Sequence, residues 1–240
     1  MLSPTVLVLY SSVHGHARRI AEHVASAVTA AGLRARTVPA HDARSADPEH
    51  ATGIVVVAPV HHRSHDGDTV AWMARHRAAI DRGPTLVLSV SLAAAGTSAG
   101  SRSEARALLA ELVLRSDVSP AIAASIGGAV DHDGTPPFAR AGLREEAARH
   151  GLDAAAGHDT DFTDWEALAK LEQRFLALLT DPAGAAGRQH VVAPSVPASP
   201  RTVQHSPASL LTHRPAGRTV PGTSAPDGPA VPSGRDPSGR

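Results

Sequence analysis

The chain has 240 residues, enough for one domain with a sizeable core, and its 23 basic and 23 acidic residues give a formal net charge of +0. A zero net charge argues against a protein that binds nucleic acid through a generally basic surface. The absence of cysteine excludes disulfides, thiolate catalysis and cysteine-ligated metal centres, and the aromatic content of 2% leaves few rings to stack on a planar cofactor.

The first predicted unit is a strand, a turn and a helix. Residues 5–10 form a continuous apolar run, typical of a strand buried on both faces, and residues 17–31 carry apolar side chains at helical spacing. The turn between them consists of Ser11, Ser12, Val13, His14, Gly15 and His16. Hydroxyl groups and backbone N–H groups at a helix N-terminus bind anions, so this turn is predicted to hold a phosphate; a plain connection between strand and helix is the alternative.

Strands and helices alternate through the next hundred residues. Further strands are predicted at residues 33–38, 54–58, 85–90 and 121–126, and further helices at 69–80 and 104–114. This alternation predicts an α/β fold with a doubly wound, five-stranded parallel sheet. Right-handed crossovers bring the carboxyl ends of such strands to one edge, where ligands bind. The segments 11–16, 59–65 and 91–101 are therefore predicted to converge on one site.

Two later segments depart from this alternation. Residues 127–161 are predicted to be an insertion after the fifth strand, with a helix at 140–150, and the final helix is predicted to begin at a capping box that starts at Thr163. Beyond residue 180 lie eleven of the chain's 19 prolines, among Gly, Ser and Thr, a composition that predicts a disordered tail. The predicted domains are thus 1–180 and 181–240, and the tail is interpreted as passive.

The sequence shows no targeting, metal or nucleophile motif. No segment resembles a signal peptide or reaches the roughly 18 consecutive apolar residues of a transmembrane helix, so a cytoplasmic protein is expected. His61, His62 and His65 are the densest group of candidate metal ligands, but adjacent loop histidines do not easily point one way, and no metal site is predicted. The G-x-S-x-G elbow is absent, and no catalytic residue is identified.

The first turn also lacks the G-x-G-x-x-G of dinucleotide-binding folds and the G-x-x-x-x-G-K-[ST] of nucleoside triphosphate sites. The remaining candidate ligand group for this turn is a single monophosphate. With such a turn, the chain resembles flavodoxin-like proteins, most closely the menaquinone-dependent protoporphyrinogen dehydrogenase branch. That branch carries a turn like Ser-Thr-x-Asp-Gly-Gln-Thr, and this chain has Ser-Ser-Val-His-Gly-His-Ala at 11–17. The stretches 57–76, 89–92 and 159–166 also resemble it, so that the resemblance covers about residues 5–180.

The resemblance implies FMN bound by three segments. Its phosphate would lie on the first turn, against Ser11, Ser12 and the backbone from Val13 to His16. Its isoalloxazine ring would be flanked on one side by Pro59, Val60, His61 and His62, and on the other by Val90, Ser91, Leu92 and Ala93. The implied reaction takes reducing equivalents from a small-molecule redox substrate, a porphyrinogen in that branch, and passes them to a quinone. The insertion corresponds to a segment that the branch uses for substrate or peripheral membrane contact.

Three departures from the branch leave a second interpretation open. Ala17 stands where the branch has a threonine hydroxyl, His14 stands where it has aspartate, and His62 stands where relatives have an aromatic residue. The alternative is a flavodoxin-like domain that has lost its flavin and acts as a binding or regulatory module. The sequence does not indicate an oligomeric state.

Overall fold

The structure is a computed structural model that describes residues 5–130, 137–154, 159–180, 191–193 and 201–202. Most of the predicted tail, at 181–190, 194–200 and 203–240, lies outside the described residues, so the predicted disorder and the boundary at residue 180 stay predictions. The described residues all belong to one unit, which ends at Gln204.

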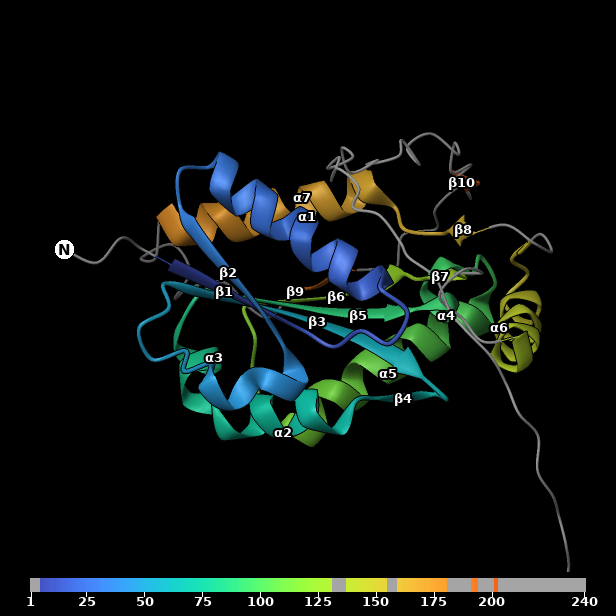
Figure 1. The fold of residues 1–240 in the computed structure, drawn as a ribbon, viewed down its shortest axis with the longest axis horizontal. Helices are drawn as coiled ribbons and strands as arrows, with labels where there is room; N and C mark the ends of the chain where they lie inside the picture. Colours follow the sequence, from blue (N-terminus) through green and yellow to red (C-terminus); the bar gives the residue numbers. More distant parts are fainter. Residues whose placement is uncertain (1–4, 131–136, 155–158, 181–190, 194–200, 203–240) are drawn as a thin grey trace, which may run out of the picture. The chain divides into compact units, whose positions relative to one another are not determined.

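A parallel five-stranded sheet forms the centre of the fold, with the order β2-β1-β3-β5-β6 (Figure 1). This confirms the α/β fold class and the doubly wound arrangement, since the order reverses between β1 and β3. The short strands β4 (Ser64–His65) and β9 (Val191–Ala193) extend it, the first antiparallel to β3 and the second parallel to β6. The five central strands are β1 (Thr5–Tyr10), β2 (Arg34–Pro39), β3 (Gly53–His61), β5 (Thr85–Ser91) and β6 (Ile122–Gly127).

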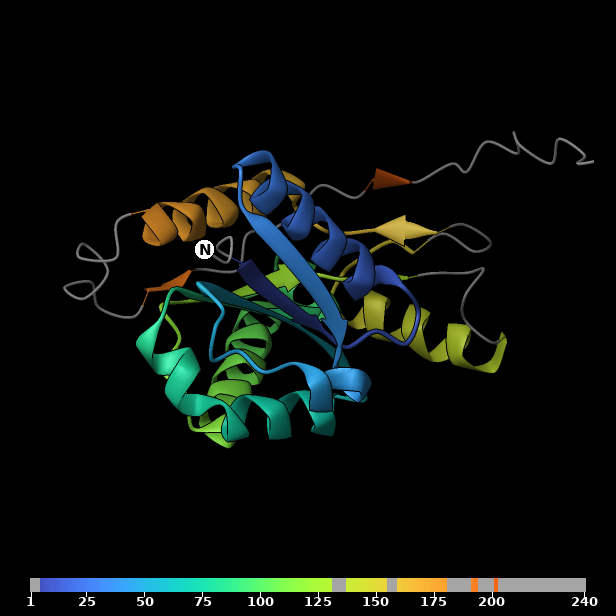
Figure 2. The same cartoon turned by 60° about the vertical axis from the view of Figure 1, so that its left-hand side comes forward.

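Helices cover both faces of the sheet, as Figures 1 and 2 show from two directions. One layer contains α1 (His16–Ala30) and α7 (Trp165–Thr180). The other contains α2 (Gly67–Arg75), α3 (Arg77–Arg82) and α5 (Ala99–Ser116), beside the 3₁₀ helix η1 (Ala40–Ser45).

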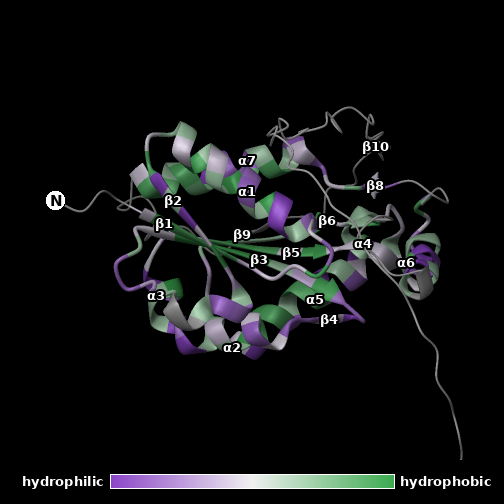
Figure 3. Cartoon of the chain, in the orientation of Figure 1, coloured by the Kyte–Doolittle hydropathy of each residue, from purple (hydrophilic) through white to green (hydrophobic). Residues whose placement is uncertain are grey.

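Each layer has its own core, because successive side chains of a strand point to opposite faces. In β1, Val6 and Val8 pack with α1 and α7, whereas Leu7 and Leu9 pack with the opposite layer. Figure 3 shows this as hydrophobic strands between helices that carry hydrophilic residues on their outer sides. The unbroken apolar runs of the sequence reflect this burial on both faces.

Several boundaries differ from the predictions for physical reasons. The predicted helix 69–80 is two helices, α2 and α3, separated at His76. Strand β3 continues to His61 through the first part of the predicted loop 59–65, because β4 folds back and pairs with it. The turn of that hairpin is His62 and Arg63, both with positive φ (50° and 61°). The predicted loop 91–101 contains the short helix α4 (Leu92–Ala95) and the start of α5.

The insertion after β6 contributes a helix and two strands of a small second sheet, whose third strand comes from the segment beyond residue 180. The strands of this sheet follow the order β10-β8-β7, with β7 at Ala129–Val130, β8 at Thr160–Asp161 and β10 at Arg201–Thr202. Helix α6 (Pro137–Arg149) lies between β7 and β8. The residue after α6 is anchored, since His150 Nδ1 lies 3.0 Å from Ser101 Oγ on α5. The insertion is therefore attached to the end of the sheet where α4 and α5 begin.

Candidate functional site

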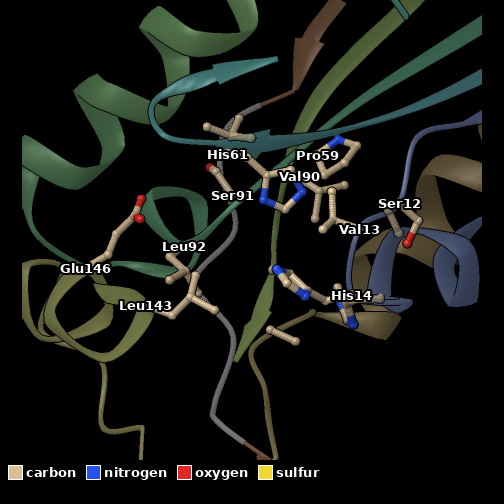
Figure 4. A pocket seen from close by; sticks show the side chains of 15 residues that line it. Ser12, Val13, His14, Pro59, His61, Val90, Ser91, Leu92, Leu143 and Glu146 are labelled. Atoms are coloured by element: carbon tan, nitrogen blue, oxygen red, sulfur yellow. The ribbon is translucent and has the colours of Figure 1, made fainter. Parts of the chain in front are cut away.

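A pocket opens at the carboxyl edge of the sheet, close to the point where the strand order reverses (Figure 4). Its cavity volume is about 60 Å³, below the roughly 300–1,000 Å³ usual for small-molecule sites, so a larger ligand would extend out through its open mouth. The lining comes from the first turn, the end of β3, the end of β5 and the insertion. It consists of Ser12, Val13, His14, His16, Ala17, Pro59, Val60, His61, Val90, Ser91, Leu92, Gly128, Ala129, Leu143 and Glu146.

The three predicted segments do converge, and ten of the fourteen predicted site residues line this pocket. The remaining four do not line it, for separate reasons. The backbone N–H of Ser11 donates to the Val57 carbonyl and joins the turn to β3, and Gly15 is the N-cap of α1. His62 lies in the exposed hairpin turn. Ala93 is buried on α4, where it packs with α5.

The first turn leads into a helix N-terminus without a side-chain cap. Gly15 is the N-cap residue, and its φ of 88° is a conformation that favours glycine. The Ser12 hydroxyl oxygen accepts a hydrogen bond from the Gly15 N–H at 3.0 Å and shapes the turn. The first helical turn contains no acidic residue. Backbone N–H groups and a positive dipole end are what an anionic ligand group needs, and nothing acidic opposes it here.

Three imidazoles give the pocket its chemical character: His14, His16 and His61. His14 Nδ1 and His61 Nε2 are buried side-chain atoms without a hydrogen-bond partner. Burial lowers the pKa of His61, and positive charge on His14 and His62 lowers it further. A ligand with polar groups at this position would satisfy nitrogens that the protein leaves unpaired.

The His16 side chain is held by Thr163, which lies just after the insertion. Its Nε2 lies 2.8 Å from Thr163 Oγ1, and the Thr163 hydroxyl donates its one hydrogen to the Gly127 carbonyl at 2.9 Å. The hydroxyl oxygen must therefore accept from His16, which places a proton on Nε2. Asp161 Oδ1 lies 3.8 Å from the same nitrogen.

The carboxylate of Asp161 connects α1 to the start of α7. Its oxygens accept hydrogen bonds from the Thr163 N–H at 2.9 Å and the Trp165 indole N–H at 3.0 Å, and it pairs with Arg19. The sequence block 159–166 thus orients a pocket histidine. The predicted capping box is one residue out of register, since the Asp164 carboxylate accepts from the Ala167 N–H at 2.9 Å.

Sequence reasoning missed the lining residues that the insertion supplies, as well as Ala17. Gly128 and Ala129 follow β6 directly, and Leu143 and Glu146 project from α6 (Figure 4). The helical pattern at 140–150 was the available signal, but the sequence does not show where that helix packs. Of the described residues in the lining, Glu146 is the one carboxylate.

Metal-ligand clusters and membrane-spanning helices are both absent from the described part of the chain. It contains no group of three or more histidine, aspartate or glutamate side chains placed to hold a metal ion. None of its helices combines the length and apolar character that crossing a membrane requires.

Three solved structures resemble part of this chain. Rubredoxin oxygen:oxidoreductase from Desulfovibrio gigas is 13% identical, with a TM-score of 0.43 over 78% of this chain and 38% of its own, so this chain spans well under half of its length. Oxidised flavodoxin 1 from Bacillus cereus is 12% identical, with a TM-score of 0.39 over 63% and 99% of the two chains. Two-electron reduced Megasphaera elsdenii flavodoxin is 17% identical, with a TM-score of 0.40 over 60% and 98%.

The family comparison is more informative than these distant likenesses. No curated protein matches the sequence. Residues 7–145 match the family described as the flavodoxin domain, a range that includes every residue lining the pocket except Glu146. The match is to the flavodoxin domain as a whole, and the narrower resemblance to protoporphyrinogen dehydrogenases stays a prediction. Because the match covers more than half of the chain, this protein belongs to the flavodoxin domain family.

Proposed function

We propose that this chain binds FMN in the pocket at the carboxyl edge of the sheet and serves as an electron-transfer flavoprotein. The observation that carries the proposal is the convergence of the first turn with the ends of β3 and β5 on one pocket, in a chain of the flavodoxin domain family. The uncapped, acid-free N-terminus of α1 borders the same pocket and suits a phosphate.

The lining suits both ends of such a ligand. Ser12 and the backbone of the first turn would hold the phosphate, while Pro59, Val60 and the segment 90–92 would flank the ring system. The unpartnered nitrogens of His14 and His61 would provide polar contacts on the phosphate side of the pocket. When bound, FMN supplies the one- and two-electron chemistry, and the protein supplies position and electrostatics.

A narrower form of the proposal concerns the substrates. The resemblance to the protoporphyrinogen dehydrogenase branch suggests a porphyrinogen as electron donor and a quinone as acceptor. Leu143 and Glu146 of the insertion support a substrate contact at the mouth, since they place an apolar side chain and a carboxylate there. The Glu146 carboxylate could accept a hydrogen bond from a pyrrole N–H. Porphyrinogen-dependent reduction of a quinone by the FMN-loaded protein tests this form.

The flavin-free module is retained as a second candidate because of two observations on the lining. Ala17 presents a methyl group where the resembling branch has a hydroxyl, and none of the described lining residues is phenylalanine, tyrosine or tryptophan. A flavin ring here would pack on aliphatic side chains and imidazoles instead.

The visible spectrum of the purified full-length chain, recorded with and without added FMN, separates the two candidates. The flavoprotein proposal expects flavin absorbance that stays with the protein, or quenching of free FMN fluorescence on titration. A protein that shows neither would be assigned to the flavin-free interpretation.

The substitution Ser12→Ala should weaken FMN binding about 2- to 12-fold, the equivalent of one net hydrogen bond of roughly 0.5–1.5 kcal/mol. The change removes the acceptor of the Gly15 N–H and the hydroxyl beside the phosphate. Fluorescence titration measures it, and riboflavin, which lacks the phosphate, should lose less affinity. Ser26→Ala, an exposed position further along α1, is the matched control. Equal FMN affinity in the Ser12 and Ser26 variants would mean that the phosphate lies elsewhere.

A further inference from the structure

The feature that the flavin proposal leaves unexplained is the pairing of two imidazoles from different elements. His14 lies in the turn before α1, and His61 is the last residue of β3. Their ring centroids are 5.7 Å apart, at an interplanar angle of 78°. Figure 4 shows the side chains of both residues lining the pocket. We call them the histidine pair.

Each member of the histidine pair has a nitrogen that is buried and has no hydrogen-bond partner: Nδ1 of His14 and Nε2 of His61. A buried polar atom without a partner loses its hydrogen bonds to water without replacing them, so two such atoms at one place are unfavourable in the free protein. Both residues line the pocket, and a bound group could therefore pair with both nitrogens.

The surroundings favour an anion over a metal ion. Structural and catalytic metal sites use three or four protein ligands, and among the described residues no third histidine or carboxylate completes a group with the histidine pair. The acid-free first turn of α1 adds a positive dipole end on the same side. A phosphate monoester, with up to two negative charges, fits this chemistry.

The other titratable groups around the histidine pair, among the described residues, are His16, His62, Asp66 and Glu146. His16 is held by Thr163, and the Asp66 carboxylate is occupied in capping α2 through the Thr69 N–H at 3.2 Å. Glu146 lies on α6, at the wall opposite the first turn (Figure 4). Among the described residues, no ion pair neutralises a charge on either member of the histidine pair.

We propose that the histidine pair binds the phosphate of FMN in its protonated form, so that binding takes up protons and weakens as the pH rises. This rests on the proposed flavin site but concerns its regulation, which the family assignment does not supply.

The direction of the pH dependence of FMN affinity follows from the charges. Burial and the charge of His14 lower the pKa of His61, so protonation of the His61 ring is disfavoured in the free pocket. A phosphate dianion that contacts the exposed edges of both rings reverses this preference, and the complex holds more protons than the free protein. Affinity then falls by up to about tenfold per pH unit for each proton taken up. Because a phosphate monoester loses its second proton near pH 6, the effect is measured above about pH 6.5.

The experiment is a set of FMN fluorescence titrations of the full chain between about pH 6.5 and pH 8.5, with calorimetry in buffers of different ionisation heat to count protons. We expect FMN affinity to fall about tenfold across this range, corresponding to net uptake of less than one proton on average. Riboflavin affinity should stay constant. His14→Asn and His61→Asn should each flatten the pH dependence, and His50→Asn, an exposed residue just before β3, should leave it unchanged.

Circular dichroism of each variant establishes that it is folded before its titration is interpreted. An FMN affinity that is independent of pH, or a pH dependence that survives both Asn substitutions, would overturn the inference and leave the flavin proposal intact. If FMN does not bind, NMR titration of the imidazoles with inorganic phosphate tests separately whether the histidine pair binds an anion. A response of both rings would support the histidine pair as an anion site without the flavin. Tight binding of Zn²⁺ alone, lost in the Asn variants, would show that the histidine pair belongs to a metal site.

Discussion

The substitution Phe162→Ala is expected to lower the free energy of unfolding by about 3–5 kcal/mol, the usual range for truncating a fully buried aromatic residue. Phe162 has 0% exposed surface. Its side chain joins the insertion to α4, because it packs in one cluster with residues from both. The cluster contains Leu92, Ala95, Val130 and Ala147, with Leu143, Leu152 and Ala154 packed around it.

This substitution should also damage ligand binding, because the cluster supports one wall of the pocket. Leu92 and Leu143 belong to the cluster and to the lining. The Phe162 N–H donates to the carbonyl of Gly128, another lining residue, at 3.0 Å. We expect FMN affinity to fall at least tenfold in the folded variant, as the wall loses its packing. Urea unfolding gives the stability change, and fluorescence titration below the unfolding transition gives the affinity.

Phe175→Ala is the matched control. Phe175 is also 0% exposed and lies in the core between the sheet and α7. It packs near Gly53, where β3 begins, at the opposite end of that strand from the pocket. We expect a similar loss of stability with FMN affinity nearly unchanged. Equal losses of affinity in the two variants would show that global loosening, and not the pocket wall, controls binding.

The sheet was predictable because its signal is local. Consecutive apolar residues such as Val6, Leu7, Val8 and Leu9 are required when both faces of a strand are covered, and the glycines and polar turns between the runs mark the boundaries. The convergence of the three loops followed from the handedness of the crossovers, which needs no knowledge of side chains. Ten predicted lining residues were found in this way.

What could not be predicted depends on contacts between distant residues. The wall formed by Leu143 and Glu146 depends on where α6 packs, and that position is fixed by buried contacts such as His150 with Ser101. The cap of α7 illustrates the same limit on a smaller scale. Thr163 and Asp164 are both good N-cap residues by sequence. The Thr163 hydroxyl donates to the Gly127 carbonyl and does not cap the helix. The Asp164 carboxylate accepts the capping hydrogen bond instead.

The contact between β6 and the segment after β8 leads to the second prediction. Gly127 lies at the end of β6, where a Cβ atom would overlap the carbonyl oxygen of Phe162 and lie 2.9 Å from its carbonyl carbon. These are backbone atoms that cannot rotate away. Gly127→Ala must therefore push β8 and the start of α7 off the sheet. We expect it to lower the free energy of unfolding by about 3 kcal/mol, at the upper end of overpacking effects.

The neighbouring Gly128→Ala is a control that differs by one position. A Cβ atom there would meet its nearest neighbour, the Ser91 carbonyl carbon, at 3.5 Å, which is an ordinary contact. We expect stability within about 0.5 kcal/mol of the original protein, because the reduced freedom of the unfolded chain compensates small adjustments. Thermal and urea unfolding of both variants measure the difference. Thr163 and Asp161 orient His16 and belong to the displaced segment, so Gly127→Ala should also weaken FMN binding. Equal stabilities of the two variants would contradict the prediction, because they would mean that this segment moves away from β6 at little cost.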